Sequence, residues 1–143
     1  MTRSNKLVML LVLGLVAAMG WQAYAADAES PVKWRKDYAA AEKEAAESGK
    51  PMLLYFTASW CGPCQAMKKS TWTDESLAAK LNDGFIPVYI DVDENQDVAK
   101  KYEVSSIPTM IVLKDGKEQD KTIGYKSVEQ MTAMVEKSGA KKS

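Results

Sequence analysis

The fold is decided by Pro51-Met52-Leu53-Leu54-Tyr55-Phe56-Thr57, followed after two residues by Trp60-Cys61-Gly62-Pro63-Cys64. The first of these stretches is a short apolar and aromatic run, which predicts a buried strand. The residues that follow the second cysteine, Gln65-Ala66-Met67-Lys68-Lys69, predict a helix. The two cysteines are therefore expected where a strand turns into the N-terminus of a helix.

This placement favours redox chemistry at the two cysteines, which are the only cysteines of the chain. Unpaired N–H groups and the positive end of the helix dipole stabilise a thiolate at Cys61. Cys64 lies on the same helix face, so it can close a disulfide once Cys61 has been attacked. Pro63 is tolerated because the N–H groups of a first helical turn have no helical partner to lose.

A Cys-x-x-Cys pair has two other interpretations. A structural zinc site needs further ligands, and the chain has no histidine and no third cysteine, which excludes an intramolecular site of the Cys/His type. A purely structural disulfide would close only a very small loop and would constrain the unfolded chain little. The prediction is therefore a redox-active pair, with no metal site.

Several motifs resemble those of the thioredoxin superfamily. Trp-Cys-Gly-Pro-Cys at 60–64 matches the active-site pentapeptide of reducing thioredoxins, and Ser106-Ile107-Pro108-Thr109 is similar to the cis-proline loop of that family. Lys114-Asp115-Gly116-Lys117 is similar to the turn between its last two strands. The run from Cys64 to Asp93 is similar to secreted thioredoxin-like proteins and to the C-terminal domain of the periplasmic thiol:disulfide interchange protein. The resemblance covers roughly Val32 to Lys137.

The resemblance implies an α/β protein with a thioredoxin fold, in which helices flank both faces of a central mixed β-sheet. It implies that Ile107-Pro108 is a cis peptide whose flanking backbone pairs with the substrate chain. It also implies that Trp60 is a lid beside Cys61 that contacts partner proteins. No organic cofactor is expected, because the Cys61–Cys64 disulfide carries the electrons and another dithiol supplies them.

The strands and helices expected from the sequence alternate. The expected strands are 32–34, 52–57 and 85–91, followed by a hairpin of 109–113 and 122–125 across Asp115-Gly116. The expected helices are 36–48, one that starts after Cys64 and breaks around 70–73, its continuation over 74–81, 97–102, and a last helix with its apolar stripe at Val128, Met131, Met134 and Val135. Pro87 is expected at the start of its strand or at a bulge.

The N-terminus predicts a secretory signal peptide at residues 1–25. Arg3 and Lys6 form a positive region, Leu7 to Met19 an apolar core, and Ala23-Tyr24-Ala25 a cleavage site. An uncleaved membrane anchor is the alternative, because the apolar segment just reaches the roughly 20 residues that a span needs. Either way the domain is expected in an oxidising compartment, which is the periplasm in a diderm bacterium.

The rest of the chain divides into a linker at 26–31, one thioredoxin-like domain at 32–138 and a polar tail at 139–143. Removal of Arg3 and Lys6 with the leader leaves 17 basic against 19 acidic residues. That balance indicates neither a nucleic acid partner nor an anionic membrane surface. The protein is expected to be a monomer.

The predicted function is an exported thiol:disulfide oxidoreductase that reduces disulfides of exported proteins and receives electrons from a membrane thiol donor. A disulfide oxidase or isomerase is one alternative, and a non-catalytic thioredoxin-fold binding module is another. The dipeptide Gly62-Pro63 argues against the first alternative, because in the family it accompanies reducing potentials. Two intact cysteines argue against the second.

The sequence departs from its relatives near the cysteines. Thioredoxins usually carry a buried aspartate six residues before the first cysteine, with a lysine partner on the next strand. This chain has Tyr55 and, by alignment, Tyr89 at those positions, and it has Lys68 where the periplasmic relative has a glutamate. A nearby carboxylate disfavours a thiolate and a lysine favours one. The prediction is that Cys61 titrates in one step and that resolution by Cys64 is slower than attack.

Overall fold

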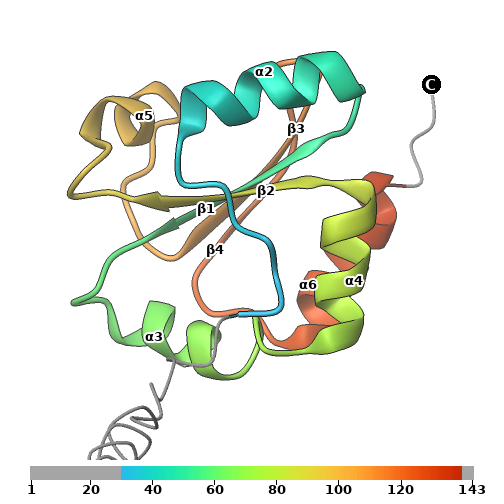
Figure 1. Ribbon diagram of the computed structural model, residues 1–143. Coiled ribbons are helices and arrows are strands. Elements are labelled where there is room, and N and C mark those ends of the chain that lie inside the picture. The colour runs from blue at the N-terminus through green and yellow to red at the C-terminus, as the bar shows by residue number, and fades with distance from the viewer. Residues whose placement is uncertain (1–29, 140–143) are drawn as a thin grey trace, which may run out of the picture.

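The computed structural model of the chain describes residues 30–139. Its elements are α2 (Tyr38–Ser48), β1 (Met52–Thr57), α3 (Gly62–Lys69), α4 (Glu75–Gly84), β2 (Ile86–Asp91), α5 (Gln96–Lys101), β3 (Thr109–Lys114), β4 (Lys117–Ile123) and α6 (Val128–Gly139) (Figure 1). The predicted signal peptide, its anchor alternative, most of the predicted linker and residues 140–143 lie outside the described residues. No helix within 30–139 has the length and apolar character to cross a membrane.

The four strands form one mixed sheet in the order β2-β1-β3-β4. β1 pairs with β2 in parallel and with β3 in antiparallel orientation, and β3 pairs with β4 in antiparallel orientation. Figure 1 shows α2 and α5 on one face of this sheet and α3, α4 and α6 on the other. The predicted α/β thioredoxin fold, with helices on both faces of a mixed sheet, is confirmed.

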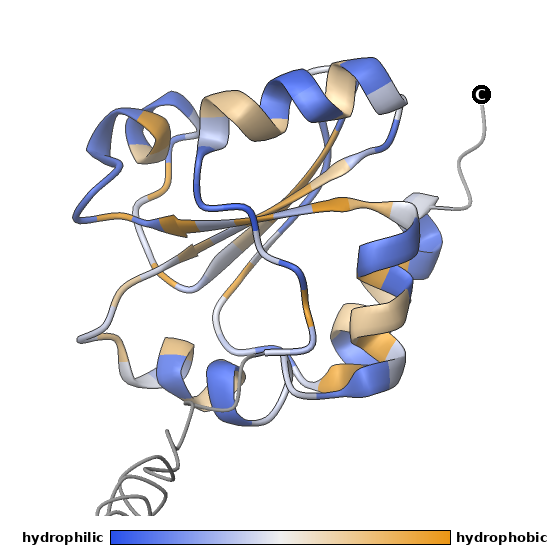
Figure 2. Cartoon of the chain, viewed as in Figure 1, coloured by the Kyte–Doolittle hydropathy of each residue, from blue (hydrophilic) through white to orange (hydrophobic). Residues whose placement is uncertain are grey.

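The central strand β1 is buried at all six positions because both faces of the sheet are covered. Leu53 and Tyr55 belong to the core under α3, α4 and α6, whereas Leu54 and Phe56 belong to the core under α2 and α5. Figure 2 shows the apolar strands between the more polar outer surfaces of the helices. The apolar side chains of β1 therefore pack against helices on both faces of the sheet. This packing holds in place the strand that leads into the cysteines.

The predicted strand at 32–34 is wrong. In its place Arg35 makes an isolated parallel bridge to Val88: its N–H donates to the carbonyl of Pro87 (2.9 Å), and its carbonyl accepts the N–H of Tyr89 (2.8 Å). The chain cannot run straight through the preceding residues, because the N–H of Trp34 turns back to the carbonyl of Val32 (3.0 Å). Pro87 is the second residue of β2, as expected for a strand at the edge of the sheet.

The last strand is longer than predicted. β4 begins at Lys117 and not at Thr122, because Asp115 (φ 52°) and Gly116 (φ 73°) form a two-residue turn that connects it directly to β3. Most of β4 is charged and exposed at the edge of the sheet, so no alternation of apolar and polar residues marked it. A register shift between Val112 and Leu113 interrupts its pairing with β3.

The helix ends follow from capping side chains. α2 starts at Tyr38, two residues later than predicted, because the Asp37 carboxylate accepts the N–H of Ala40 (3.0 Å) as its N-cap. The predicted break between α3 and α4 is confirmed, and Asp74 caps α4. That helix continues past its predicted stop to Gly84, and Asn82 within it accepts the N–H of Lys33 (2.8 Å).

Candidate active site

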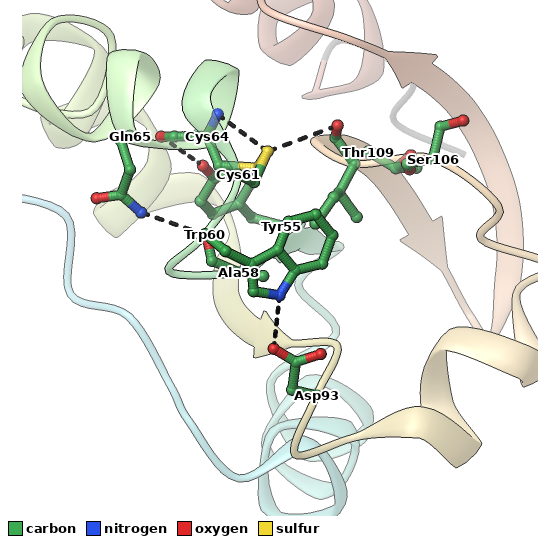
Figure 3. Close-up of a disulfide and its surroundings, with 10 residues drawn as sticks. Tyr55, Ala58, Trp60, Cys61, Cys64, Gln65, Asp93, Ser106 and Thr109 are labelled. Atoms are coloured by element: carbon green, nitrogen blue, oxygen red, sulfur yellow. Dashed lines mark hydrogen bonds between the residues drawn. A yellow bond between two sulfur atoms is a disulfide. The ribbon is translucent and has the colours of Figure 1, made fainter.

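Cys61 and Cys64 form a disulfide at the start of α3, at the end of the loop that follows β1 (Figure 3). Their Cα atoms are 5.2 Å apart, a separation typical of disulfides. Cys61 is the N-cap residue and is 5% exposed, whereas Cys64 lies in the first turn and is fully buried. Of the two cysteines, only Cys61 has solvent-exposed surface.

Backbone groups of the first turn point at Cys61. The N–H of Cys64 donates to the Sγ of Cys61 across 3.3 Å, and the N–H of Gln65 donates to the carbonyl of Cys61 across 3.0 Å. Gly62 and Pro63 occupy the first two helical positions, where proline has no helical N–H bond to lose. An N–H donor and the positive end of the helix both stabilise negative charge on this sulfur after reduction.

Trp60 stands beside the disulfide and is 67% exposed. Its indole N–H donates to the Oδ2 atom of Asp93 across 2.8 Å (Figure 3). This bond links the loop before α3 to the turn after β2, so it holds a large exposed ring near Cys61. The contribution of Asp93 could not be found from the sequence, because only the fold brings these two loops together.

The Ile107–Pro108 peptide bond is cis. The Sγ of Cys61 lies 3.7 Å from the carbonyl oxygen of Ile107, and the Pro108 carbonyl accepts the N–H of Gly124 (2.8 Å). The Thr109 hydroxyl donates to the carbonyl of Ser106 (2.6 Å). The bond from Gly124 ties the loop to the segment after β4, and the contact of the Ile107 carbonyl places the loop against the disulfide.

A groove of about 480 Å³ runs between the cysteine loop and the proline loop. It brings together five of the predicted site residues, namely Trp60, Cys61, Gly62, Pro63 and Ile107, along with Val92, Val104, Ser105 and Ser106. The other two predicted residues, Cys64 and Pro108, are buried behind the groove wall. The predicted site residues are thus contiguous, with one sulfur at the groove and the other beneath it.

Tyr55 and Tyr89 lie behind the disulfide as neighbours in the β1–β2 register, with ring centroids 5.9 Å apart. The Tyr55 hydroxyl donates to the carbonyl of Cys64 (3.2 Å). Burial raises the pKa of Tyr55 above its usual value, and burial together with Asp91 raises the pKa of Tyr89. Both groups are therefore neutral hydroxyls at physiological pH.

Within residues 30–139, no cluster of three or more His, Cys, Asp or Glu side chains is arranged to hold a metal ion. The chemistry available at the groove is that of the cysteine pair. A sulfur at a helix N-terminus, next to a second sulfur that can displace it, is suited to thiol–disulfide exchange.

Residues 34–137 match the family model described as Thioredoxin. A thioredoxin H-type from Oryza sativa subsp. indica is 36% identical over 106 residues, which covers 74% of this chain and 84% of the relative. A thioredoxin from Staphylococcus aureus (strain Mu50) is 43% identical over 91 residues, with 64% and 84% of the two chains covered.

Solved structures agree with these relatives. The solution structure of a thioredoxin from Thermus thermophilus has a TM-score of 0.70 and 25% sequence identity, and covers 78% of this chain and 89% of that one. DsbH oxidoreductase has a TM-score of 0.66 at 20% identity, with 78% and 86% covered, and supports the fold alone. The chain belongs to the thioredoxin family, and its Cys61–Cys64 pair makes it a thiol:disulfide oxidoreductase.

Proposed function

We propose that this protein is an exported reductase of protein disulfides, in which Cys61 is the nucleophile and Cys64 the resolving cysteine. The observation that carries this proposal is the asymmetry of the pair. Cys61 lies at the groove and its sulfur accepts an N–H bond at 3.3 Å, whereas Cys64 is fully buried. A nucleophile has to be accessible and stable as a thiolate, and a resolving group needs only to reach the first sulfur.

The reaction is a two-step exchange. The Cys61 thiolate attacks one sulfur of the substrate disulfide, so that bond breaks, a mixed disulfide forms and the other substrate sulfur leaves as a thiolate. The Cys64 thiolate then attacks the Sγ of Cys61, which re-forms the internal disulfide and releases the second substrate thiol. Two electrons pass to the substrate. Another dithiol, which we place at the membrane, then has to reduce the Cys61–Cys64 disulfide with two electrons. No further cofactor is needed.

The groove suits an extended polypeptide that carries a disulfide. The Ile107 carbonyl lies 3.7 Å from the Cys61 sulfur, so backbone pairing with this loop would align a substrate cysteine with the nucleophile. Trp60 offers a large exposed ring at the rim of the same groove. We propose that a monomer binds its substrate with these two elements.

The reducing direction is tested by the reduction potential. The pair Gly62-Pro63 predicts a value close to the roughly −270 mV of thioredoxin, and equilibration with a dithiothreitol buffer followed by mass spectrometry measures it. A potential near the roughly −180 mV of protein disulfide isomerase, or above it, would favour the oxidase or isomerase alternative. A wild-type protein that reduces no disulfide, together with a Cys61→Ala variant that keeps the function of the protein in cells, would favour the binding-module alternative.

Export is tested separately. The proposal is that residues 1–25 direct the chain across a membrane and are then removed after Ala25. The intact mass of the protein from the exported fraction should correspond to a chain that starts at Ala26. A species that keeps Met1 and sediments with membranes would identify the anchor alternative. A protein that stays in the cytosol would refute export while leaving the exchange chemistry intact.

A further inference from the structure

A second cavity of about 550 Å³ lies behind the disulfide. It shares no lining residue with the substrate groove, and the buried Cys64 forms part of its wall. Its other walls come from β1, β2, α3, the segment after α3 and the segment before α2. Figure 1 shows that last segment in blue, as it runs from beside α3 to α2. The volume is within the range of about 300–1,000 Å³ that small-molecule sites occupy.

The wall of this cavity is aromatic. Trp34 packs against Tyr55 and Trp72, with ring centroids 5.6 and 5.1 Å apart, and Tyr55 packs against Trp72 at 5.0 Å. Tyr89 completes the set through its contacts with Trp34 and Tyr55. Rings in tilted and edge-to-face contact hold one another in place. Their side chains therefore lose little conformational entropy when a flat ligand binds against them.

A buried donor in this wall has no partner. Trp72 is 2% exposed, and within the part of the chain that the structure describes its Nε1–H makes no hydrogen bond. The Tyr55 hydroxyl, which donates to the carbonyl of Cys64, is close enough for the Trp72 indole to act against the rise in its pKa, but the two groups are not in hydrogen-bond geometry. Buried polar groups are usually paired, since an unpaired donor costs free energy. An acceptor supplied by a ligand would pair it.

The charge of the lining has one sign. Lys33, Lys36 and Lys68 contribute to it, and no aspartate or glutamate does. None of the three lysines takes part in an ion pair within residues 30–139. Three lysine side chains in the lining of an aromatic cavity are complementary to an anion with an apolar body.

We infer that this cavity binds a small aromatic carboxylate, with the ring against the aromatic wall and the carboxylate among the lysines. Such a ligand would lie against the back of Cys64 and leave the groove at Cys61 open. A ligand in this cavity therefore does not compete with the protein substrate for the groove, and thiol exchange can proceed while the ligand is bound. Its existence does not depend on the direction of electron flow or on export.

Calorimetric titration of the oxidised full chain with naphthalene-2-carboxylate tests the inference. We expect saturable binding at one site, and binding of uncharged 2-naphthamide weaker by roughly tenfold, because the amide lacks the charge-assisted contacts. Lys68→Gln should weaken carboxylate binding by roughly two- to fivefold. The matched control is Lys69→Gln, which should leave binding unchanged because Lys69 does not line the cavity. Absence of saturable binding, equal binding of the amide, or equal losses in both variants would overturn the inference.

Indole N–H signals in ¹H–¹⁵N NMR spectra locate the bound ligand. Trp34 and Trp72 line this cavity, whereas Trp60 lines the groove, so the first two signals should shift on titration and the third should not. Tryptophan-to-phenylalanine variants assign the signals. Shifts confined to Trp60 would place the carboxylate in the substrate groove and overturn the inference.

Discussion

The hydroxyl of Tyr55 donates a hydrogen bond across 3.2 Å to the backbone carbonyl of Cys64, on the buried side of the disulfide. Tyr55 thereby ties the central strand to the first turn of the active-site helix. Its hydroxyl is directed to the backbone, and burial raises its pKa, so it carries no negative charge near neutral pH. The residue behind the cysteines in this protein positions Cys64 and is not an acid that titrates with it.

The first prediction concerns the titration of the reduced protein. Because Tyr55 and Tyr89 are neutral, the thiolate of Cys61 should form in a single step as the pH rises, and resolution should be slower than attack at neutral pH. The ultraviolet absorbance of the thiolate, followed against pH, measures the titration. A two-step curve that persists in Cys64→Ser would show that a coupled acid is present after all.

The second prediction concerns stability. Tyr55→Phe removes the bond to the Cys64 carbonyl and should lower the free energy of unfolding by roughly 0.5–1.5 kcal/mol at pH 7. Urea denaturation of the oxidised protein measures this change. The control is Tyr125→Phe, which removes a hydroxyl from a side chain that is 45% exposed and should change stability by less than about 0.5 kcal/mol. Equal effects of the two variants would contradict the role given to Tyr55.

The third prediction concerns alkaline pH. The pKa of Tyr55 is raised in the folded protein, so above the ordinary tyrosine value of 10.0 the unfolded chain releases a proton that the folded chain keeps. The free energy of unfolding is therefore unaffected by this hydroxyl below pH 10 and falls as the pH rises further. The slope is up to about 1.4 kcal/mol per pH unit for each tyrosine whose pKa is raised in the folded protein. Relative to its own stability at pH 8, Tyr55→Phe should lose less by pH 11 than the wild-type protein. Parallel curves for the two proteins would refute this.

The fourth prediction concerns Asp93, which accepts the indole N–H of Trp60 at 2.8 Å. Asp93→Ala frees the ring and should raise KM for a protein disulfide by roughly two- to tenfold, by loss of one hydrogen bond, with little change in kcat. Asp93→Asn keeps an acceptor oxygen and should retain most of the affinity. Rates with a small disulfide that does not reach Trp60 are the control. A loss of the same size for that small disulfide would show that Asp93 acts on the cysteines instead.

The part of the fold next to the cysteines was predictable because its signals are local. The apolar run before Trp60 marks a strand that is buried on both faces, and the glycine and proline at 62–63 fit a first helical turn. The start of β4 at Lys117 was not predictable from periodicity, because an exposed edge strand has no apolar face to reveal it. The bridge at Arg35 was missed because it depends on β2, about fifty residues further along the chain.

The groove brings together five of the predicted site residues, but the contacts that support them were not predicted. The resemblance placed Tyr55 at the position of the family's aspartate and Tyr89 at that of its lysine partner, and the register of β1 and β2 pairs the two tyrosines. Nothing in the sequence indicated that Asp93 would hold Trp60, or that Trp34 and Trp72 would meet behind Cys64. Those contacts join segments that only tertiary packing brings together.

The central claim is that Cys61 attacks and Cys64 resolves. Incubation of reduced Cys64→Ser and Cys61→Ser proteins with insulin, followed by non-reducing electrophoresis and mass spectrometry, tests it most directly. Cys64→Ser should accumulate a mixed disulfide through Cys61, because Cys61 lines the groove and no resolving thiol remains. Cys61→Ser should accumulate none, because Cys64 is fully buried. Equal amounts of mixed disulfide from both proteins would contradict the account.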